Sequence, residues 1–180
     1  RILVMGVSGS GKSHIGHQLA LTLGATFIDG DDYHSPANVA KMASGKPLND
    51  DDRSEWLDTL AALFAEYQAR GESLVIACSG LKKRYRDRLR QGDPALQILY
   101  LEGSRELLLE RLETRAGHFF KGDTMLASQL ADLEPPSEEE AFNASIALSP
   151  QAIITQFAAT LPTPSRSPST SWPIWAMNSI

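Results

Sequence analysis

The chain has 180 residues, a length that fits one globular domain large enough to bury its own core. Its 17 basic and 22 acidic residues give a formal net charge of -5, which argues against a general nucleic-acid binder because such proteins present a basic surface. The single cysteine, Cys78, excludes a disulfide within the chain, and no apolar run approaches the about 20 residues that a membrane-spanning helix needs. We therefore expect a cytoplasmic protein that binds neither nucleic acid nor membrane.

Short apolar runs alternate with helical patterns along most of the chain. The pattern predicts five strands, at 2–5, 26–28, 74–78, 96–101 and 145–148. Between the first three strands it predicts a helix from the glycines after the first strand to Gly24, a helix from Ser35 to about Gly45 and a helix from Asn49 to Gly71. The later helices are predicted at 82–90, from Leu107 to Gly117 and from Ser149 to about Ala159. This alternation predicts an α/β fold in three layers, with a central, mainly parallel five-stranded sheet flanked by helices.

The composition changes at the carboxyl end of the chain. Prolines recur among serines and threonines from 162 to 180, and no acidic residue occurs there. Such a stretch cannot continue a helix and is typical of a tail without packed structure, although Trp172 and Trp175 are unusual in one. We expect one folded domain at 1–161 and a disordered tail at 162–180.

A phosphate-binding loop follows the first predicted strand and opens the first predicted helix. The segment GVSGSGKS at 6–13 fits the pattern G-x-x-x-x-G-K-[ST]. Glycines let the backbone wrap closely around phosphate, and the helix N-terminus adds positive potential. The predicted nucleotide contacts are Gly6, Ser8, Gly9, Ser10 and Gly11, with Lys12 at the β- and γ-phosphates and the Ser13 hydroxyl at Mg²⁺.

Carboxylates follow the second predicted strand, whereas none follows the third, which ends Ala77-Cys78-Ser79. In an open α/β sheet, ligands lie beyond the carboxyl ends of the strands, so Asp29 and Asp31 are expected near the phosphate loop. A carboxylate there can accept the proton of an acceptor hydroxyl or assist Mg²⁺ through water. Neither a guanine-reading N-K-x-D stretch nor a D-x-x-G switch is present. His34 lies close enough in sequence to touch the same substrate.

A basic run occupies the helix predicted at 82–90. Most of this run is expected to be a solvated helix face, and only its first residues, Lys82 and Lys83, are placed to face the crevice. Arg111 and Arg115 are four residues apart and share a helical face just before Gly117.

The segments MGVSGSGKS, DGDDYH, KMASGKPLNDDDR, CSGLKKRYRD and GHFF together resemble the gluconate kinases, over residues 1 to about 136. Gly80 departs from the alanine of the family pattern, and nothing beyond Ala159 matches it. The resemblance implies ATP, Mg²⁺ and D-gluconate as ligands, a lid at about 115–135, and often a dimer. By this likeness Asp31 is the catalytic base and Asp29 lies beside the metal, although the two roles could be exchanged. Arg53 and His118 then reach substrate, Arg111 reaches ATP, and Arg115 neutralises charge during transfer.

Other functions remain open from the sequence. A shikimate or nucleotide kinase would share the loop and the fold, and a non-catalytic NTP-dependent switch would share the loop alone. For Arg53, the alternative is a solvated helix charge paired with Asp50 or Asp52. The carboxylates beside the loop and the lid arginines favour a kinase.

Overall fold

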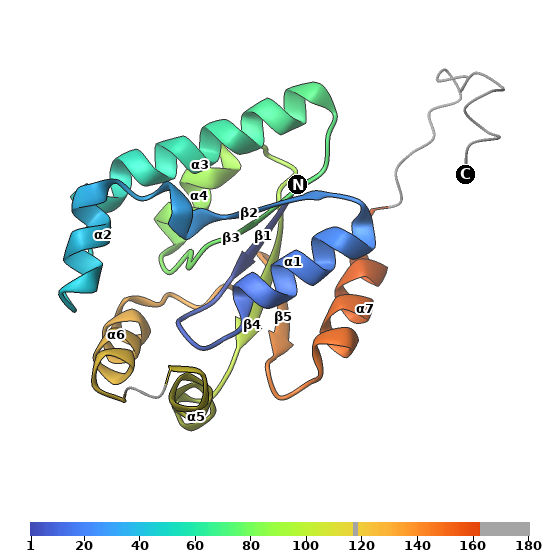
Figure 1. Cartoon of the computed structure of the whole chain (residues 1–180). Helices are drawn as coiled ribbons and strands as arrows, with labels where there is room; N and C mark the ends of the chain where they lie inside the picture. The colour runs from blue at the N-terminus through green and yellow to red at the C-terminus, as the bar shows by residue number, and fades with distance from the viewer. Residues whose placement is uncertain (117–118, 163–180) are drawn as a thin grey trace, which may run out of the picture.

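A computed structural model describes residues 1–116 and 119–162, and for 115–116 and 119–124 it describes the backbone alone. Its centre is a five-stranded sheet with the strand order β2-β3-β1-β4-β5, in which every pair of neighbours is parallel (Figure 1). The predicted parallel α/β fold is confirmed. The strands are β1 (Ile2–Met5), β2 (Thr26–Asp29), β3 (Leu74–Ala77), β4 (Gln97–Glu102) and β5 (Phe142–Ser145).

The described ranges contain seven α-helices and one 3-10 turn. They are α1 (Lys12–Leu23), η1 (Gly30–Tyr33), α2 (Pro36–Ala43), α3 (Asp50–Arg70), α4 (Lys83–Arg90), α5 (Arg105–Ala116), α6 (Phe119–Asp132) and α7 (Pro150–Thr160). All but α7, which follows β5, lie between strands. None of these helices combines the length and the apolar character needed to cross a membrane. The proline-rich stretch at 163–180 lies outside the described residues, so the expectation of a disordered tail stays a prediction.

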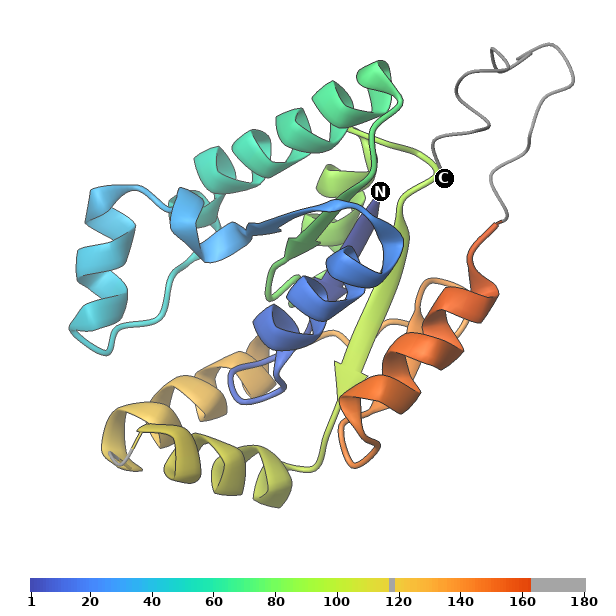
Figure 2. The same cartoon turned by 45° about the vertical axis from the view of Figure 1, so that its right-hand side comes forward.

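The sheet separates two hydrophobic cores. Successive side chains of a strand point to opposite faces, so Ile2 and Val4 of β1 enter one core while Leu3 and Met5 enter the other. Helices α1 and α7 cover the first face, and α3 and α4 cover the second (Figure 1). Helices α5 and α6 lie side by side at one end of the sheet, and α2 lies at the same end (Figure 2).

The helix ends follow the predicted signals. Asn49 caps α3 in a reciprocal box with Asp52, and Ser35 and Ser149 each accept a hydrogen bond from a backbone amide of the helix that they precede. Gly24 and Gly71 end α1 and α3 in the left-handed conformation that glycine adopts most easily. Local sequence therefore determines where these helices begin and end.

Two elements differ from the prediction. The last strand runs from Phe142 to Ser145 rather than over 145–148, because its partner β4 ends at Glu102. The Ile146 amide donates a final bond to the Glu102 carbonyl, and the chain then turns, leaving Leu148 40% exposed. The segment at 119–132, predicted only as part of a lid, is a helix of more than three turns.

The basic run on α4 is not wholly solvated, and that prediction is wrong at Arg86. Its side chain is only 1% exposed. The guanidinium donates to the backbone carbonyls of Gly80, Leu81 and Glu134 and to the Glu140 carboxylate, 2.8 Å from Nε. Arg86 thus ties the loop after β3 to the segment that joins α6 to β5.

We predict that Arg86→Met destabilises the fold by about 3 kcal/mol, because it leaves three carbonyls without their buried donor and leaves Glu140 with Arg90 alone. Arg88→Met on the same helix is the matched control, since Arg88 pairs with Asp58 at the surface and its loss is expected to cost about 1 kcal/mol or less. Urea unfolding of both variants measures the difference. Equal stabilities for the two would contradict the clamp assigned to Arg86.

Candidate active site

The turn between β1 and α1 is shaped to hold an anion. Gly9 and Gly11 have φ angles of 86° and 83°, in the left-handed region that favours glycine. A Cβ atom at Gly9 would also lie 2.9 Å from the Leu108 carbonyl oxygen. Because Gly11 at the N-cap of α1 has no side chain, no cap bonds to the first amides of that helix. These amides and the helix dipole are available to phosphate.

Asp29, at the end of β2, joins this loop to the next one. Its Oδ2 accepts a hydrogen bond of 2.9 Å from the Ser13 hydroxyl, and its Oδ1 accepts one of 3.1 Å from the backbone amide of Asp31. Parallel pairing of β2 with β3, and of β3 with β1, brings the carboxyl ends of all three strands to one edge. The sequence-based expectation that Asp29 and Asp31 lie near the phosphate loop agrees with this arrangement.

A cavity of about 150 Å³ lies between the phosphate loop and Asp31. Its walls come from the loop, from η1, α2 and α3, from the end of β3 and from α6. Lys12, Asp31, His34 and Arg53 all line it, so four residues that the sequence assigned to substrate or catalysis meet there. The lining residues are Ser8, Lys12, Asp31, His34, Met42, Pro47, Leu48, Arg53, Trp56, Ser79, Met125, Ser128 and Gln129.

His34 is held rigidly beside Asp31. Its ring stacks on Trp56 with 4.1 Å between the ring centroids. The indole N–H of Trp56 in turn donates a hydrogen bond of 2.7 Å to the Gly30 carbonyl. The imidazole Nε2 lies 3.8 Å from Asp31 Oδ1. Burial lowers the pKa of His34 below its ordinary value, and the nearby Asp31 only partly opposes this shift. The neutral imidazole is therefore favoured at neutral pH.

Arg53 is a buried cation aimed at the cavity, with only 7% of the residue exposed. Its guanidinium donates a hydrogen bond of 2.9 Å to the Tyr85 hydroxyl and lies 3.9 Å from the Asp132 carboxylate. The Tyr85 hydroxyl in turn donates to Asp50. The alternative of a solvated Arg53 paired with Asp50 or Asp52 does not describe this arrangement, because the link to Asp50 runs through Tyr85.

One face of α6 forms a wall that the sequence analysis missed. Met125, Ser128 and Gln129 line the cavity, and Asp132 reaches Arg53. Their spacing of three, four and seven residues from Met125 is that of a single helical face. Recognising 119–132 as a helix would have predicted this wall. Its polar residues had no other sequence signal.

Other predicted residues lie away from the cavity wall. The Lys82 ammonium is 3.5 Å from Asp50, and Lys83, 63% exposed, pairs with Asp87 at 2.8 Å. Arg111 donates to the backbone carbonyl of Ile146. The side chain of Arg115 and the whole of His118 lie outside the described residues, so their assignments stay predictions.

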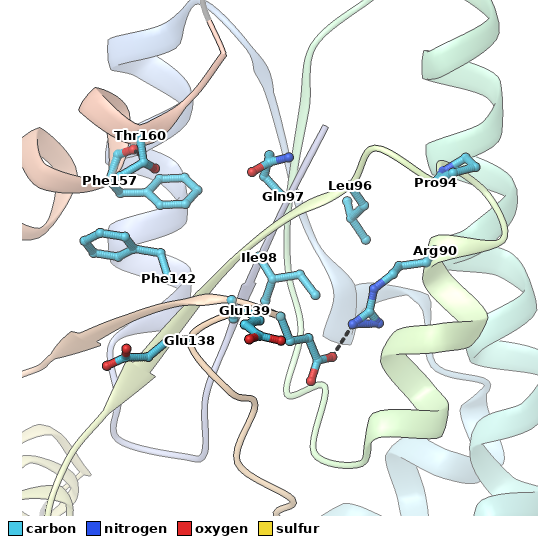
Figure 3. A pocket seen from close by; sticks show the side chains of 12 residues that line it. Arg90, Pro94, Leu96, Gln97, Ile98, Glu138, Glu139, Phe142, Phe157 and Thr160 are labelled. Carbon is cyan, nitrogen blue, oxygen red and sulfur yellow. Dashed lines mark hydrogen bonds and ion pairs between the residues drawn. The ribbon is translucent and has the colours of Figure 1, made fainter.

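A second cavity, of about 500 Å³, opens at the opposite edge of the sheet. It lies beside Gln97, which pairs with Ile2 at the start of β1, whereas the phosphate loop follows the end of that strand. Figure 3 shows Glu138 and Glu139 at its rim. Arg90 donates a hydrogen bond to a third lining glutamate, Glu140. This cavity is larger but has no anion-binding turn, so it is not the catalytic site.

A phosphate loop at the carboxyl edge of a parallel sheet, facing carboxylates across a cavity, defines a P-loop kinase. The family model described as an AAA domain matches residues 2–136. The chain is 49% identical to the thermoresistant gluconokinase of Escherichia coli K12, over 77% of this chain and 78% of that one. The chain therefore belongs to the gluconokinase family, as the resemblance predicted.

Solved structures agree with this assignment. A gluconokinase from Sinorhizobium meliloti 1021 superposes with a TM-score of 0.77 at 42% identity, covering 88% of this chain and 89% of that one. A sugar kinase from Janibacter sp. HTCC2649, in an unliganded structure, superposes with a TM-score of 0.82 at 40% identity, covering 88% and 91%. The fold and the enzyme class inferred from the sequence are thereby confirmed.

Cys78, beside the cavity, is predicted to be unreactive in the native protein. It is completely buried directly after β3, and burial raises the pKa of its thiol to about 12. Because the thiolate is the nucleophile, a thiol reagent at pH 8 should label the native chain very slowly and the chain unfolded in guanidinium quickly, with one equivalent. Rapid labelling without denaturant would show that this region opens readily.

Proposed function

We propose that the protein transfers the γ-phosphoryl group of ATP to the terminal hydroxyl of D-gluconate, giving 6-phospho-D-gluconate and ADP. The observation that carries the proposal is the cavity, which has Lys12 of the phosphate loop and Asp31 on its walls together with the buried cation Arg53. The names of the relatives support gluconate as the acceptor.

In this proposal the phosphate loop and Lys12 hold the β- and γ-phosphates. The hydroxyl oxygen of the acceptor forms the new bond to phosphorus, the bond from the γ-phosphorus to the bridging oxygen breaks, and ADP leaves. The carboxylate of Asp31 accepts the hydroxyl proton. Asp31 suits this role because it lines the cavity, whereas Asp29 is engaged by the Ser13 hydroxyl and the Asp31 amide. His34, stacked and buried, orients Asp31 and the substrate.

Mg²⁺ fits the oxygen donors at Ser13 and Asp29. A hydroxyl and a carboxylate 2.9 Å apart are hard ligands, and Mg²⁺ commonly uses one or two protein oxygens together with substrate phosphates and water. In the described part of the chain no group of three or more His, Cys, Asp or Glu residues could hold a metal ion. When bound, the ion neutralises charge on the phosphates.

Arg53 is proposed to bind the carboxylate of gluconate. A guanidinium can donate two parallel hydrogen bonds to a carboxylate, and this one is already oriented by Tyr85 and Asp132. A neutral sugar would leave the buried cation without that partner, which disfavours glucose. Lys82, Lys83 and His118 stay predicted substrate contacts, and Arg111 and Arg115 stay predicted nucleotide and transfer contacts.

The alternatives are less well supported. A non-catalytic switch needs no carboxylate facing the γ-phosphate and no buried cation in an acceptor cavity. A shikimate kinase would share both features, but the relatives at 39–49% identity carry the name gluconokinase.

The two aspartates should respond differently to substitution. We expect Asp31→Asn to lower kcat by about 100-fold or more, because the amide cannot accept the hydroxyl proton. Asp29→Asn should instead raise the Mg²⁺ concentration needed for half-maximal rate, since it weakens a metal-side ligand. Rates measured over a Mg²⁺ titration separate the two effects. The reverse pattern would exchange the roles.

The acceptor preference tests the proposed function directly. With purified protein, ATP and Mg²⁺, the rate of ADP release with gluconate should be far higher than the rate with glucose, because glucose lacks the carboxylate. It should also be higher than the rate with shikimate, because the rigid ring of shikimate holds its hydroxyls closer to the carboxylate than an open six-carbon chain does. Each acceptor is compared at equal concentration. Glucose or shikimate outperforming gluconate would contradict the substrate assignment while leaving the kinase class intact.

A further inference from the structure

Gln129 joins α6 to the phosphate loop. The backbone N–H of Ser8 donates a hydrogen bond of 2.7 Å to Gln129 Oε1, although the two residues are 121 positions apart in sequence. A backbone N–H can only donate, so this contact fixes the carboxamide with its oxygen toward the loop. The Nε2 group, with two donors, then has no protein partner among the residues that the structure describes.

The position of Gln129 determines what those donors can reach. Of the loop residues 6–13, Ser8 and Lys12 are the two that line the cavity, and Asp31 lines it as well. A phosphoryl group that moves from the loop to an acceptor beside Asp31 must enter this space. Gln129 lines the same cavity. Its hydrogen bond to Ser8 places it on the side of the cavity formed by the phosphate loop.

We propose that Gln129 binds the terminal phosphoryl group of the nucleotide, with Oε1 anchored on the Ser8 amide and Nε2 donating to a γ-phosphoryl oxygen. The proposal rests on the proposed transfer of that group from the phosphate loop, but not on the identity of the acceptor. Gln129 thereby distinguishes ATP from ADP, and α6 registers which nucleotide the loop holds.

A purely structural role makes a different prediction. If Gln129 only braced the loop, its oxygen alone would matter, and Gln129→Glu would replace it because a carboxylate oxygen also accepts from the Ser8 amide. If the Nε2 donors contact phosphate, Gln129→Glu should be the more harmful change, since it places a negative charge against the γ-phosphoryl group. Gln129→Leu removes both the acceptor and the donors.

The test is nucleotide binding by the full chain without acceptor, measured by calorimetry with Mg²⁺. ADP is compared with an analogue of ATP that carries a non-hydrolysable β,γ-imido bridge. We expect both variants to bind ADP within about threefold of the wild type. The analogue should bind about tenfold more weakly to Gln129→Leu, the loss typical of a hydrogen bond to a charged group, and weaker still to Gln129→Glu. Gln156→Leu and Gln156→Glu, on the exposed face of α7, are the matched controls and should bind like the wild type.

Two outcomes would overturn the proposal. Wild-type binding of the analogue by Gln129→Glu, with weak binding of both nucleotides by Gln129→Leu, would show that Gln129 is only a brace. Unchanged binding by both variants would exclude any contact with the nucleotide. Failure of gluconate as an acceptor would overturn the proposed substrate but would leave this comparison unaffected, because no acceptor is present in it.

Discussion

The turn between β1 and α1 is so tight that only glycine fits at residue 9, where any side chain would meet the Leu108 carbonyl. The glycine at the N-cap of α1 leaves the first turn of that helix open to an anion. Two other parts of the site are bonded directly to this turn and to the start of α1: Asp29 accepts from the Ser13 hydroxyl, and Gln129 accepts from the Ser8 amide. Without the turn, the carboxylates and Arg53 would form a polar cavity with no phosphoryl donor.

The parallel sheet explains why residues so distant in sequence meet there. Because β2, β3 and β1 run in the same direction, their carboxyl ends place Asp29, Ser79 and the phosphate loop along one edge. At the opposite edge the larger cavity is lined by the starts of β4 and β5, the ends of α4 and α7 and the acidic segment before β5, and it has no anion-binding turn. The direction of the strands, rather than the size of a cavity, identifies the edge of the sheet that carries the active site.

Helix α6 is fastened to this edge by polar contacts along its carboxyl-terminal half and just beyond. Gln129 bonds the phosphate loop, Asp132 approaches the buried Arg53, and the Glu134 amide donates 2.7 Å to the Leu81 carbonyl. Arg86 adds a bond to the Glu134 carbonyl from the core side. The phosphate loop, Arg53 and the loop after β3 are thus linked through one segment.

The sequence by itself determined the phosphate loop, the first four strands and the ends of α1 and α3, because these depend on short-range patterns: glycines at the turn, apolar runs, and caps such as Asn49 with Asp52. With the family resemblance it also predicted that Asp31, His34 and Arg53 act together. It did not predict the wall formed by α6, the burial of Arg86 or the bounds of β5. Those features depend on partners far along the chain. Gln129 is positioned by its hydrogen bond with Ser8, Arg86 is buried against Glu140, and β5 ends where its partner strand β4 ends. A polar side chain carries no local sign of such a partner, and only the tertiary structure reveals which ones are buried against it.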